Sequence, residues 1–274
     1  MSKTIAITGG TSGIGLVTVK KLAKKGWSIF LLARNKEKAE RIMQDIEGDV
    51  SFIQCDLTNL ETVRSAAEEL DKATDNLDIL MNNAGGIVQK RHVTIDGFEE
   101  TFQMNHLGHF LLTEMLIEKL KVSNARIINI SSEAHRMGNP DFNDLNWKNR
   151  SYKGWQAYGD AKLFNIYFTK GLDSRYRENG ISSFAVHPGV VNTNFGGGSS
   201  GLMKIGIKVL KPFMITPEKG AETQLFLAEE EGIEKHSGRY FVKKKVKSPS
   251  SLAREESLSE KLWEESMKMI QPLL

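Results

Sequence analysis

The sequence predicts an α/β protein in which helices flank a doubly wound parallel sheet. Short apolar runs alternate with longer amphipathic runs along the chain, which is the pattern of repeated β-α-β units. Several short runs are apolar on both faces, as the buried strands of a parallel sheet are. The length of 274 residues fits one large domain or two small ones. Because no repeat and no long linker interrupts the pattern, we predict a single domain over residues 1–274.

The predicted elements follow this alternation in order. Short, mostly apolar runs predict strands at residues 3–8, 28–33, 50–54, 77–81, 125–130 and 181–187, and residues 237–242 are a candidate for one more. Amphipathic runs predict helices at residues 14–25, 36–46, 60–73, 97–120 and 155–177.

Local signals refine this outline at three places. The sequence TNLE at residues 58–61 has the form of a capping box, which predicts Thr58 as the cap of the third helix. Two stretches break the alternation, a polar one at residues 133–156 and a glycine-rich one at residues 194–216. Both are long enough to be functional loops, and we predict that the second is a lid.

Composition limits the classes of function. The net charge of +3 is too small to indicate a nucleic-acid partner, and the basic run KKKVK at residues 243–247 is interpreted as a solvated loop. The single cysteine, Cys55, excludes an intrachain disulfide and a cysteine-based zinc cluster. His106 and His109 lie three residues apart, but without a ligand cluster we interpret them as packing residues and expect no metal site. His187 is likewise interpreted as structural.

No targeting signal is expected from the sequence. The first residues enter a strand-like segment without a long apolar stretch, so we expect no signal peptide. No run of ~18 apolar residues predicts a membrane span. A cytoplasmic location is therefore the expectation.

A glycine-rich turn joins the first strand to the first helix. In TGGTSGIG, residues 8–15, Gly9 would allow a tight turn, Gly13 a close approach to a pyrophosphate, and Gly15 close packing of the helix on the sheet. The amino terminus of the helix would stabilise an anion. This strand–turn–helix context predicts a Rossmann-type dinucleotide site, which would include Thr11, Ser12 and Ile14. A turn without a ligand is the alternative interpretation.

Five motifs, taken in order, resemble a known family. TGGTSGIG is followed by NNAG at residues 82–85, SS at 131–132, YGDAK at 158–162 and HPGVVNT at 187–193. Together they resemble the short-chain dehydrogenase/reductase superfamily over nearly the whole chain. The 25 residues between Ser132 and Tyr158, together with HPGVVNT and the C-terminal sequence, resemble its retinol-dehydrogenase-like branch. The resemblance implies a mainly dinucleotide-binding half, 1–130, and a catalytic and substrate-binding half, 131–250.

The resemblance also implies how a cofactor would be held. The family places its ribose-reading residue after the second strand, where this chain has Arg34. An acidic residue there would favour NAD(H), whereas a guanidinium can bind a 2′-phosphate, so NADP(H) is favoured and NAD(H) remains the alternative. A solvated surface arginine is the other interpretation. The remaining implied cofactor contacts are Asp56 and Leu57 at the adenine, Asn83, Ala84 and Gly85 beside the cofactor, and Pro188, Gly189, Val191 and Thr193 at the nicotinamide.

Tyr158 and Lys162 are four residues apart and would share one face of a helix. A phenol titrates near pH ~10, and a nearby ammonium would lower that pKa. By the resemblance, Tyr158 is the general acid–base and Lys162 tunes it and binds the nicotinamide ribose. Ser132, rather than its rival Ser131, would orient the substrate oxygen. Asn105 matches the asparagine with which the family holds a water in a proton relay.

The retinol-dehydrogenase-like branch often acts on hydrophobic carbonyls and alcohols, so a small hydrophobic substrate is expected. The predicted pocket walls are Trp155, Ile87 in the loop 86–88, Phe195 and residues 201–214. Residues 201–214 form an amphipathic pattern with three interpretations. They could be a substrate lid, a membrane-surface helix giving peripheral membrane contact, or an ordinary packed helix.

Two alternative functions and the possibility of a homo-oligomer remain open. The chain could be an NAD(P)-binding regulatory or scaffold protein with little turnover, although the set of Ser132, Tyr158 and Lys162 argues against this. It could also be an epimerase or dehydratase of the same fold, with tightly held NAD. The resemblance further suggests a homo-oligomer, in which the helices at 97–120 and 155–177 form a four-helix dimer interface as in many relatives.

Overall fold

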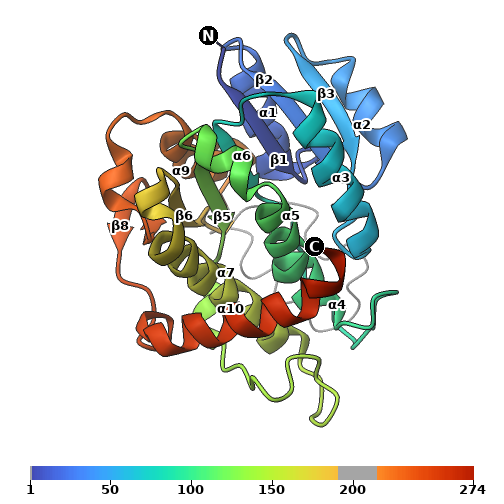
Figure 1. Cartoon of the computed structure of the whole chain (residues 1–274), viewed down its shortest axis with the longest axis vertical. Coiled ribbons are helices and arrows are strands. Elements are labelled where there is room, and N and C mark those ends of the chain that lie inside the picture. Colours follow the sequence, from blue (N-terminus) through green and yellow to red (C-terminus); the bar gives the residue numbers. More distant parts are fainter. Residues whose placement is uncertain (1, 191–214) are drawn as a thin grey trace.

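The predicted doubly wound sheet is confirmed. We analysed a computed structural model, which describes residues 2–190 and 215–274. In this part of the chain one eight-stranded sheet has the order β3-β2-β1-β4-β5-β6-β7-β8 (Figure 1). Its first seven strands are parallel and β8 is antiparallel to β7. The strands are β1 (Thr4–Thr8), β2 (Ser28–Ala33), β3 (Val50–Gln54), β4 (Ile79–Asn82), β5 (Arg126–Ile130), β6 (Ser182–His187), β7 (Arg239–Val242) and β8 (Lys245–Lys247).

The strand order determines where a ligand site can form. The chain builds β1, β2 and β3 outward in one direction and then returns to place β4 on the other side of β1. In such sheets the crevice lies outside the carboxyl ends of the strands at this reversal. The reversal here lies between β1 and β4, directly beside the glycine-rich turn.

Helices cover both faces of the sheet. They are α1 (Gly13–Ala23), α2 (Lys36–Met43), α3 (Leu60–Ala73), α4 (Glu100–Phe102), α5 (Gly108–Met115), α6 (Ile117–Val122), α7 (Gly154–Tyr176), α9 (Pro217–Glu229) and α10 (Glu256–Ile270). Shorter turns are the π-helix η1 (Gln103–Leu107) and the 3-10 helices η2 (Glu133–Met137), η3 (Arg177–Asn179), η5 (Ile233–His236), η6 (Leu252–Arg254) and η7 (Gln271–Leu273).

Alternating strand residues feed two separate cores. Ile5 and Ile7 of β1 pack with residues of α1, α2 and α9, whereas Ala6 packs with residues of α3, α5, α7 and α10. This is the period of two expected for a strand that is buried on both faces.

The predicted helix at residues 97–120 is wrong as a continuous element. The chain there forms α4, the π-turn η1, α5 and then α6, with a break at Leu116. In η1 the Gly108 N–H bonds to the Gln103 carbonyl five residues earlier, so one extra residue is accommodated in the turn. Apolar periodicity identified the helical character of the region, but it cannot detect a single inserted residue.

Two further local predictions need correction. The cap of α3 is Asn59 instead of Thr58, because the Asn59 side chain accepts a hydrogen bond of 3.1 Å from the Glu61 N–H. The basic run at residues 243–247 is a hairpin turn followed by the edge strand β8 rather than a loop. Its lysines remain exposed, and charge on an edge strand discourages pairing with another chain.

The helices expected to form a dimer interface are buried within this chain. All residues of α7 from Ala157 to Thr169 are buried, and so are the first six residues of α5. The cover is provided by α10, which lies across α7 in Figure 1. Trp263 of α10 packs edge-on against Phe110 of α5, with ring centroids 4.9 Å apart. A four-helix interface through α5 and α7 is therefore blocked, and any homo-oligomer would need another surface.

No helix among residues 2–190 and 215–274 is both long enough and apolar enough to cross a membrane. Residues 191–214, which include most of the predicted lid and all of the amphipathic pattern at 201–214, lie outside the described residues.

We expect Trp263→Ala to lower the free energy of unfolding by about 3–5 kcal/mol, the usual range for removing a buried aromatic side chain. Trp263 is 7% exposed and contacts rings on both α5 and α7. Trp155→Ala is the matched control because Trp155 is 48% exposed. Chemical denaturation of both variants measures the difference, and equal losses would contradict this role of α10.

Candidate active site

A cleft of about 1340 Å³ opens at the carboxyl ends of the strands, where the strand order reverses. It brings together residues that are far apart in the sequence. Of the residues predicted to form the site, it is lined by Gly9, Thr11, Ser12, Gly13, Ile14, Gly15, Arg34, Asp56, Leu57, Asn83, Ala84, Gly85, Ile87, Ser132, Trp155, Tyr158, Lys162, Pro188 and Gly189. Val191, Thr193 and Phe195 lie outside the described residues.

The glycine-rich turn packs closely against the loop after β4 and against its own backbone. Gly9 has φ +68°, and a Cβ there would lie 2.9 Å from the Ala84 Cα. A Cβ on Gly15 would lie 2.5 Å from the Gly9 carbonyl oxygen and 2.6 Å from the Asn83 side chain. Only glycine therefore fits at either position. The first turn of α1 contains no acidic residue, so its partial positive charge is available to an anion.

A hydroxyl in β1 fixes the loop that follows β4. Thr8 Oγ1 accepts hydrogen bonds of 3.0 Å from both the Asn83 and the Ala84 N–H groups. Both acceptor positions of the hydroxyl are then used, so its proton must be donated to His109 Nε2, 2.8 Å away. His109 consequently carries its own proton on Nδ1, which donates to the Asn105 carbonyl oxygen at 3.2 Å. Burial lowers the pKa of His109 to about 3, which keeps the ring neutral.

Asn105 is not part of the cleft lining, but its side chain holds the loop after β4 by hydrogen bonds. Its Oδ1 accepts from the Gly86 N–H at 3.1 Å, and its Nδ2 donates to the Gly86 and Thr101 carbonyls, each at 2.8 Å. A Cβ on Gly85 would lie 2.4 Å from Asn105 Oδ1 and 3.1 Å from Lys162 Nζ. The side chain thus positions backbone, and the predicted part of Asn105 in a proton relay stays a prediction.

Ser132, Tyr158 and Lys162 meet where β5 ends against α7. Tyr158 is 7% and Lys162 3% exposed. Lys162 Nζ lies 5.4 Å from the centre of the Tyr158 ring and donates to the Ile130 carbonyl at 3.0 Å. The hydroxyl of Ser132 hydrogen-bonds to that of Tyr158 and also accepts from the Ala134 N–H at 3.2 Å. Ser131, the rival serine, instead donates to the Lys162 carbonyl at 2.7 Å.

The electrostatics of this group differ from the sequence-based expectation. Burial raises the pKa of Tyr158, and the hydrogen bond from Ser132 opposes that rise. Burial also lowers the pKa of Lys162 to about 7. The expected lowering of the Tyr158 pKa by Lys162 is therefore not seen, because burial raises that pKa and the opposing influence comes from the Ser132 hydrogen bond.

The far end of the cleft is basic. Arg34 follows β2, and Lys38 of α2 lines the same end of the cleft together with Asn35. Asn35 caps α2 by accepting a hydrogen bond of 2.7 Å from the Lys38 N–H. Asp56 Oδ1 is held by the Thr58 N–H and hydroxyl at 3.0 and 2.7 Å. This end therefore presents two cations and one restrained carboxylate.

The rim on the Tyr158 side is apolar. Met137, Trp155 and Val190 line the cleft and are 51%, 48% and 48% exposed. Sequence analysis identified only Trp155 among these three, and it also missed Met104, Gln89 and Glu133 in the lining. Met137 and Glu133 belong to η2, which lies in a polar stretch without apolar periodicity, so the sequence did not indicate that it lines the cleft.

The residues present fit a dinucleotide. The start of α1 offers partial positive charge to a pyrophosphate, and Asn83 Oδ1 is buried without a hydrogen-bond partner among the described residues. Residues 3–144 also match the family described as short chain dehydrogenase. The chain belongs to this family. It is thus an NAD(P)-dependent short-chain dehydrogenase/reductase.

Relatives of known name define the branch. The chain is 39% identical to retinol dehydrogenase 13 of Homo sapiens, over 98% of this chain and 84% of that protein. It is 38% identical to retinol dehydrogenase 12 of Homo sapiens, over 98% and 86%. Among solved structures, an uncharacterised protein from Mycobacterium paratuberculosis superposes with a TM-score of 0.80 at 28% identity, over 98% of this chain and 93% of that one. These likenesses confirm the retinol-dehydrogenase-like branch of the family.

We expect Lys162→Met to remove part of the pH dependence of stability. The pKa of Lys162 falls from 10.5 to about 7 on folding. Between these values the unfolded chain binds a proton that the folded chain does not, so the contribution of Lys162 to folding becomes more favourable as the pH rises. The free energy of unfolding of the wild type minus that of the variant should therefore increase from pH 7 to about pH 10. Denaturant unfolding at several pH values measures this difference, and a constant or falling difference would show that Lys162 is not desolvated.

Proposed function

We propose that this protein is an NADP(H)-dependent oxidoreductase that interconverts a hydrophobic carbonyl compound and its alcohol, with Tyr158 as the general acid–base. The observation that carries the proposal is the buried contact of Ser132, Tyr158 and Lys162 in the same cleft as the glycine-rich turn. Proton transfer and hydride transfer must occur at adjacent atoms of one carbonyl group. A single cleft that holds both sets of residues meets this requirement.

The state of each side chain supports proton transfer at Tyr158. Burial raises the pKa of this phenol, so it holds its proton at neutral pH and can donate that proton to a substrate oxygen. Ser132 hydrogen-bonds to the Tyr158 hydroxyl, so it lies beside the position where the substrate oxygen would develop negative charge and its hydroxyl can donate to that oxygen once the substrate is bound. When bound, the nicotinamide would supply or accept the hydride. Lys162 lies beside the Tyr158 ring, and its ammonium form would stabilise the phenolate that remains after the proton has been donated.

Arg34 and Lys38 support NADP(H) over NAD(H). Both line the end of the cleft where the adenosine would lie if the pyrophosphate sits at the start of α1. A guanidinium can pair with a 2′-phosphate through two parallel hydrogen bonds. A 2′-hydroxyl would gain less from two cations, so NAD(H) should bind more weakly.

The apolar rim supports a hydrophobic substrate. Large apolar side chains that are about half exposed bury further surface when an apolar ligand covers them. Met137, Trp155 and Val190 are three such residues around the entrance to Tyr158. The names of the similar retinol dehydrogenases are consistent with this class of substrate.

We predict that Arg34→Asp weakens NADPH binding by about 2 kcal/mol or more, roughly 30-fold, because a charge-assisted contact is replaced by repulsion. NADH binding should change much less. The control is Lys36→Asp, since Lys36 lies two residues away and its side chain is 63% exposed beside Glu40. Fluorescence titration of both cofactors against the three proteins is the measurement, and equal affinities of the wild type for NADPH and NADH would refute the assignment.

We predict that Tyr158→Phe lowers kcat by at least ~100-fold, as expected when a general acid is lost. The affinity for NADPH should be nearly unchanged, because the ring remains. Steady-state turnover of a good carbonyl substrate, followed by NADPH absorbance, gives kcat, and titration gives the affinity. Near-normal turnover would remove Tyr158 from the mechanism.

A further inference from the structure

The loop after β4 forms one wall of the cleft on the Tyr158 side. Its residues Ile87 and Gln89 line the cleft. The residues that alternate with them, Gly86 and Val88, make backbone hydrogen bonds to side chains from elsewhere in the chain. We call residues 86–89 the wall loop.

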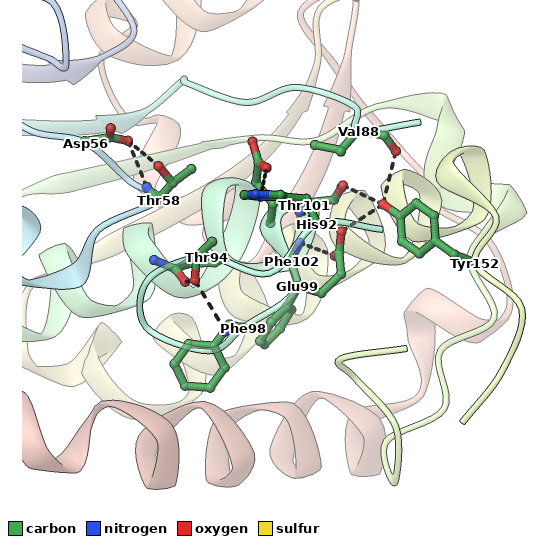
Figure 2. Close-up of polar contacts among 12 residues, drawn as sticks. Asp56, Thr58, Val88, His92, Thr94, Phe98, Glu99, Thr101, Phe102 and Tyr152 are labelled. Carbon is green, nitrogen blue, oxygen red and sulfur yellow. Dashed lines mark hydrogen bonds and ion pairs between the residues drawn. The ribbon is translucent and has the colours of Figure 1, made fainter. Parts of the chain in front are cut away.

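Two side chains hold the wall loop on either side of Ile87. Asn105 binds both the N–H and the carbonyl of Gly86, as described above. On the other side, the single proton of the Tyr152 hydroxyl is shared between Glu99 Oε1 at 2.8 Å and the Val88 carbonyl at 3.1 Å (Figure 2). The backbone of Ile87 is therefore restrained at both neighbouring residues. Tyr152 comes from the long stretch between Ser132 and Tyr158.

The anchor of Tyr152 is itself rigid. Glu99 is 1% exposed and caps α4, with Oε1 accepting from the Thr101 N–H at 2.9 Å and Oε2 from the Phe102 N–H at 2.8 Å. The Thr101 hydroxyl lies 3.1 Å from that of Tyr152. Figure 2 shows these groups converging on the tyrosine oxygen. A displacement of Tyr152 would thus disturb a buried cap as well as the Val88 contact.

The same carbonyl also contacts the start of α7. A Cβ added to Gly154 would lie 2.5 Å from the Val88 oxygen and 3.1 Å from the Gln89 Cα, so α7 begins directly against the wall loop. The next residue, Trp155, lines the cleft from α7. Tyr152 therefore links the two cleft-lining segments that carry Ile87 and Trp155, and only two residues separate it from Trp155.

We propose that Tyr152 is a positioning residue that sets the separation of Ile87 and Trp155 and so determines how well the cleft accepts bulky apolar substrates. This proposal rests on the proposed function, because it assigns the substrate to the Tyr158 side of the cleft. Tyr152 touches neither the reacting atoms nor the cofactor end of the cleft. Its effect should therefore appear in the binding of large substrates and leave the chemical step unchanged.

The first test compares Tyr152→Phe with Tyr167→Phe. Tyr167 is a matched control, because its hydroxyl also donates to a backbone carbonyl, that of Leu252, at 2.9 Å, but it lies in the core that α7 shares with α10. We expect Tyr152→Phe to lower kcat/KM for a bulky apolar aldehyde at least about fivefold through KM, the value of one hydrogen bond. A short-chain aldehyde and the affinity for NADPH should be unaffected, and Tyr167→Phe should show no selectivity between the aldehydes. Equal losses for both aldehydes, or the same selectivity in both variants, would overturn the proposal.

The second test needs no activity. Hydrogen–deuterium exchange of the ligand-free protein should be faster for amides in residues 86–92 of Tyr152→Phe, and unchanged there in Tyr167→Phe. Unchanged exchange in this segment of Tyr152→Phe would overturn the proposal. If the wild type reduced neither aldehyde and no other carbonyl, the proposed function would fail and the substrate role of Tyr152 with it. The exchange result would then still show whether Tyr152 holds the wall loop, which separates the two failures.

Discussion

The hydroxyl of Thr8 is the contact on which the geometry of the cleft depends. It lies at the end of β1 and accepts hydrogen bonds from two consecutive N–H groups after β4, which closes the gap at the reversal of strand order. Because its proton is then committed to His109, it also fixes the carbonyl of Asn105. One small side chain thereby connects the end of β1, the loop after β4 and the π-turn. The side chains of Thr8, Asn105 and His109 are buried, so the loss of one partner would leave a costly unpaired donor or acceptor.

Burial of polar side chains near the cleft carries an electrostatic cost. Tyr158 and Lys162 are nearly inaccessible to water, and burial displaces the pKa of each toward its neutral form. The fold compensates with fixed partners, namely the Ser132 hydroxyl for Tyr158 and the Ile130 carbonyl for Lys162. Stability must come from elsewhere, and the thirteen consecutive buried residues of α7 under α10 are one source. The cover by α10 also buries the faces of α5 and α7 that the sequence suggested as a dimer interface.

The sequence predicted the parts of the fold that depend on repeated patterns. The strands could be predicted because residues buried on alternate faces, or on both faces, form an apolar pattern over several residues. The glycine-rich turn could be predicted from the spacing of its glycines between a strand and a helix. The irregularities of the helix at residues 97–120 could not, because the π-turn η1 contains one extra residue and the break at Leu116 involves a single residue, and neither alters the apolar pattern over several residues. The Asn59 cap was missed because Thr58 satisfied the same motif one position earlier, and its hydroxyl instead bonds to Asp56.

Long-range contacts explain the remaining differences. Tyr152 lies in a polar stretch without periodicity, and only the fold shows that its hydroxyl reaches Val88 and Glu99, which are 64 and 53 residues away in sequence. The lowered pKa of Lys162 also depends on burial that residue spacing does not reveal. Family motifs identified which residues gather in the cleft, whereas the direction of their pKa shifts required the packing around them.

We propose above all that the cleft at the strand reversal holds NADP(H) with its nicotinamide at Tyr158. A crystal structure of the chain with NADP⁺ bound is the most direct measurement. We expect density for the pyrophosphate at the start of α1, the 2′-phosphate against Arg34, and the nicotinamide ribose within hydrogen-bonding distance of Lys162 Nζ. Density for the cofactor in another place, or in this cleft with the nicotinamide directed away from Tyr158, would contradict it.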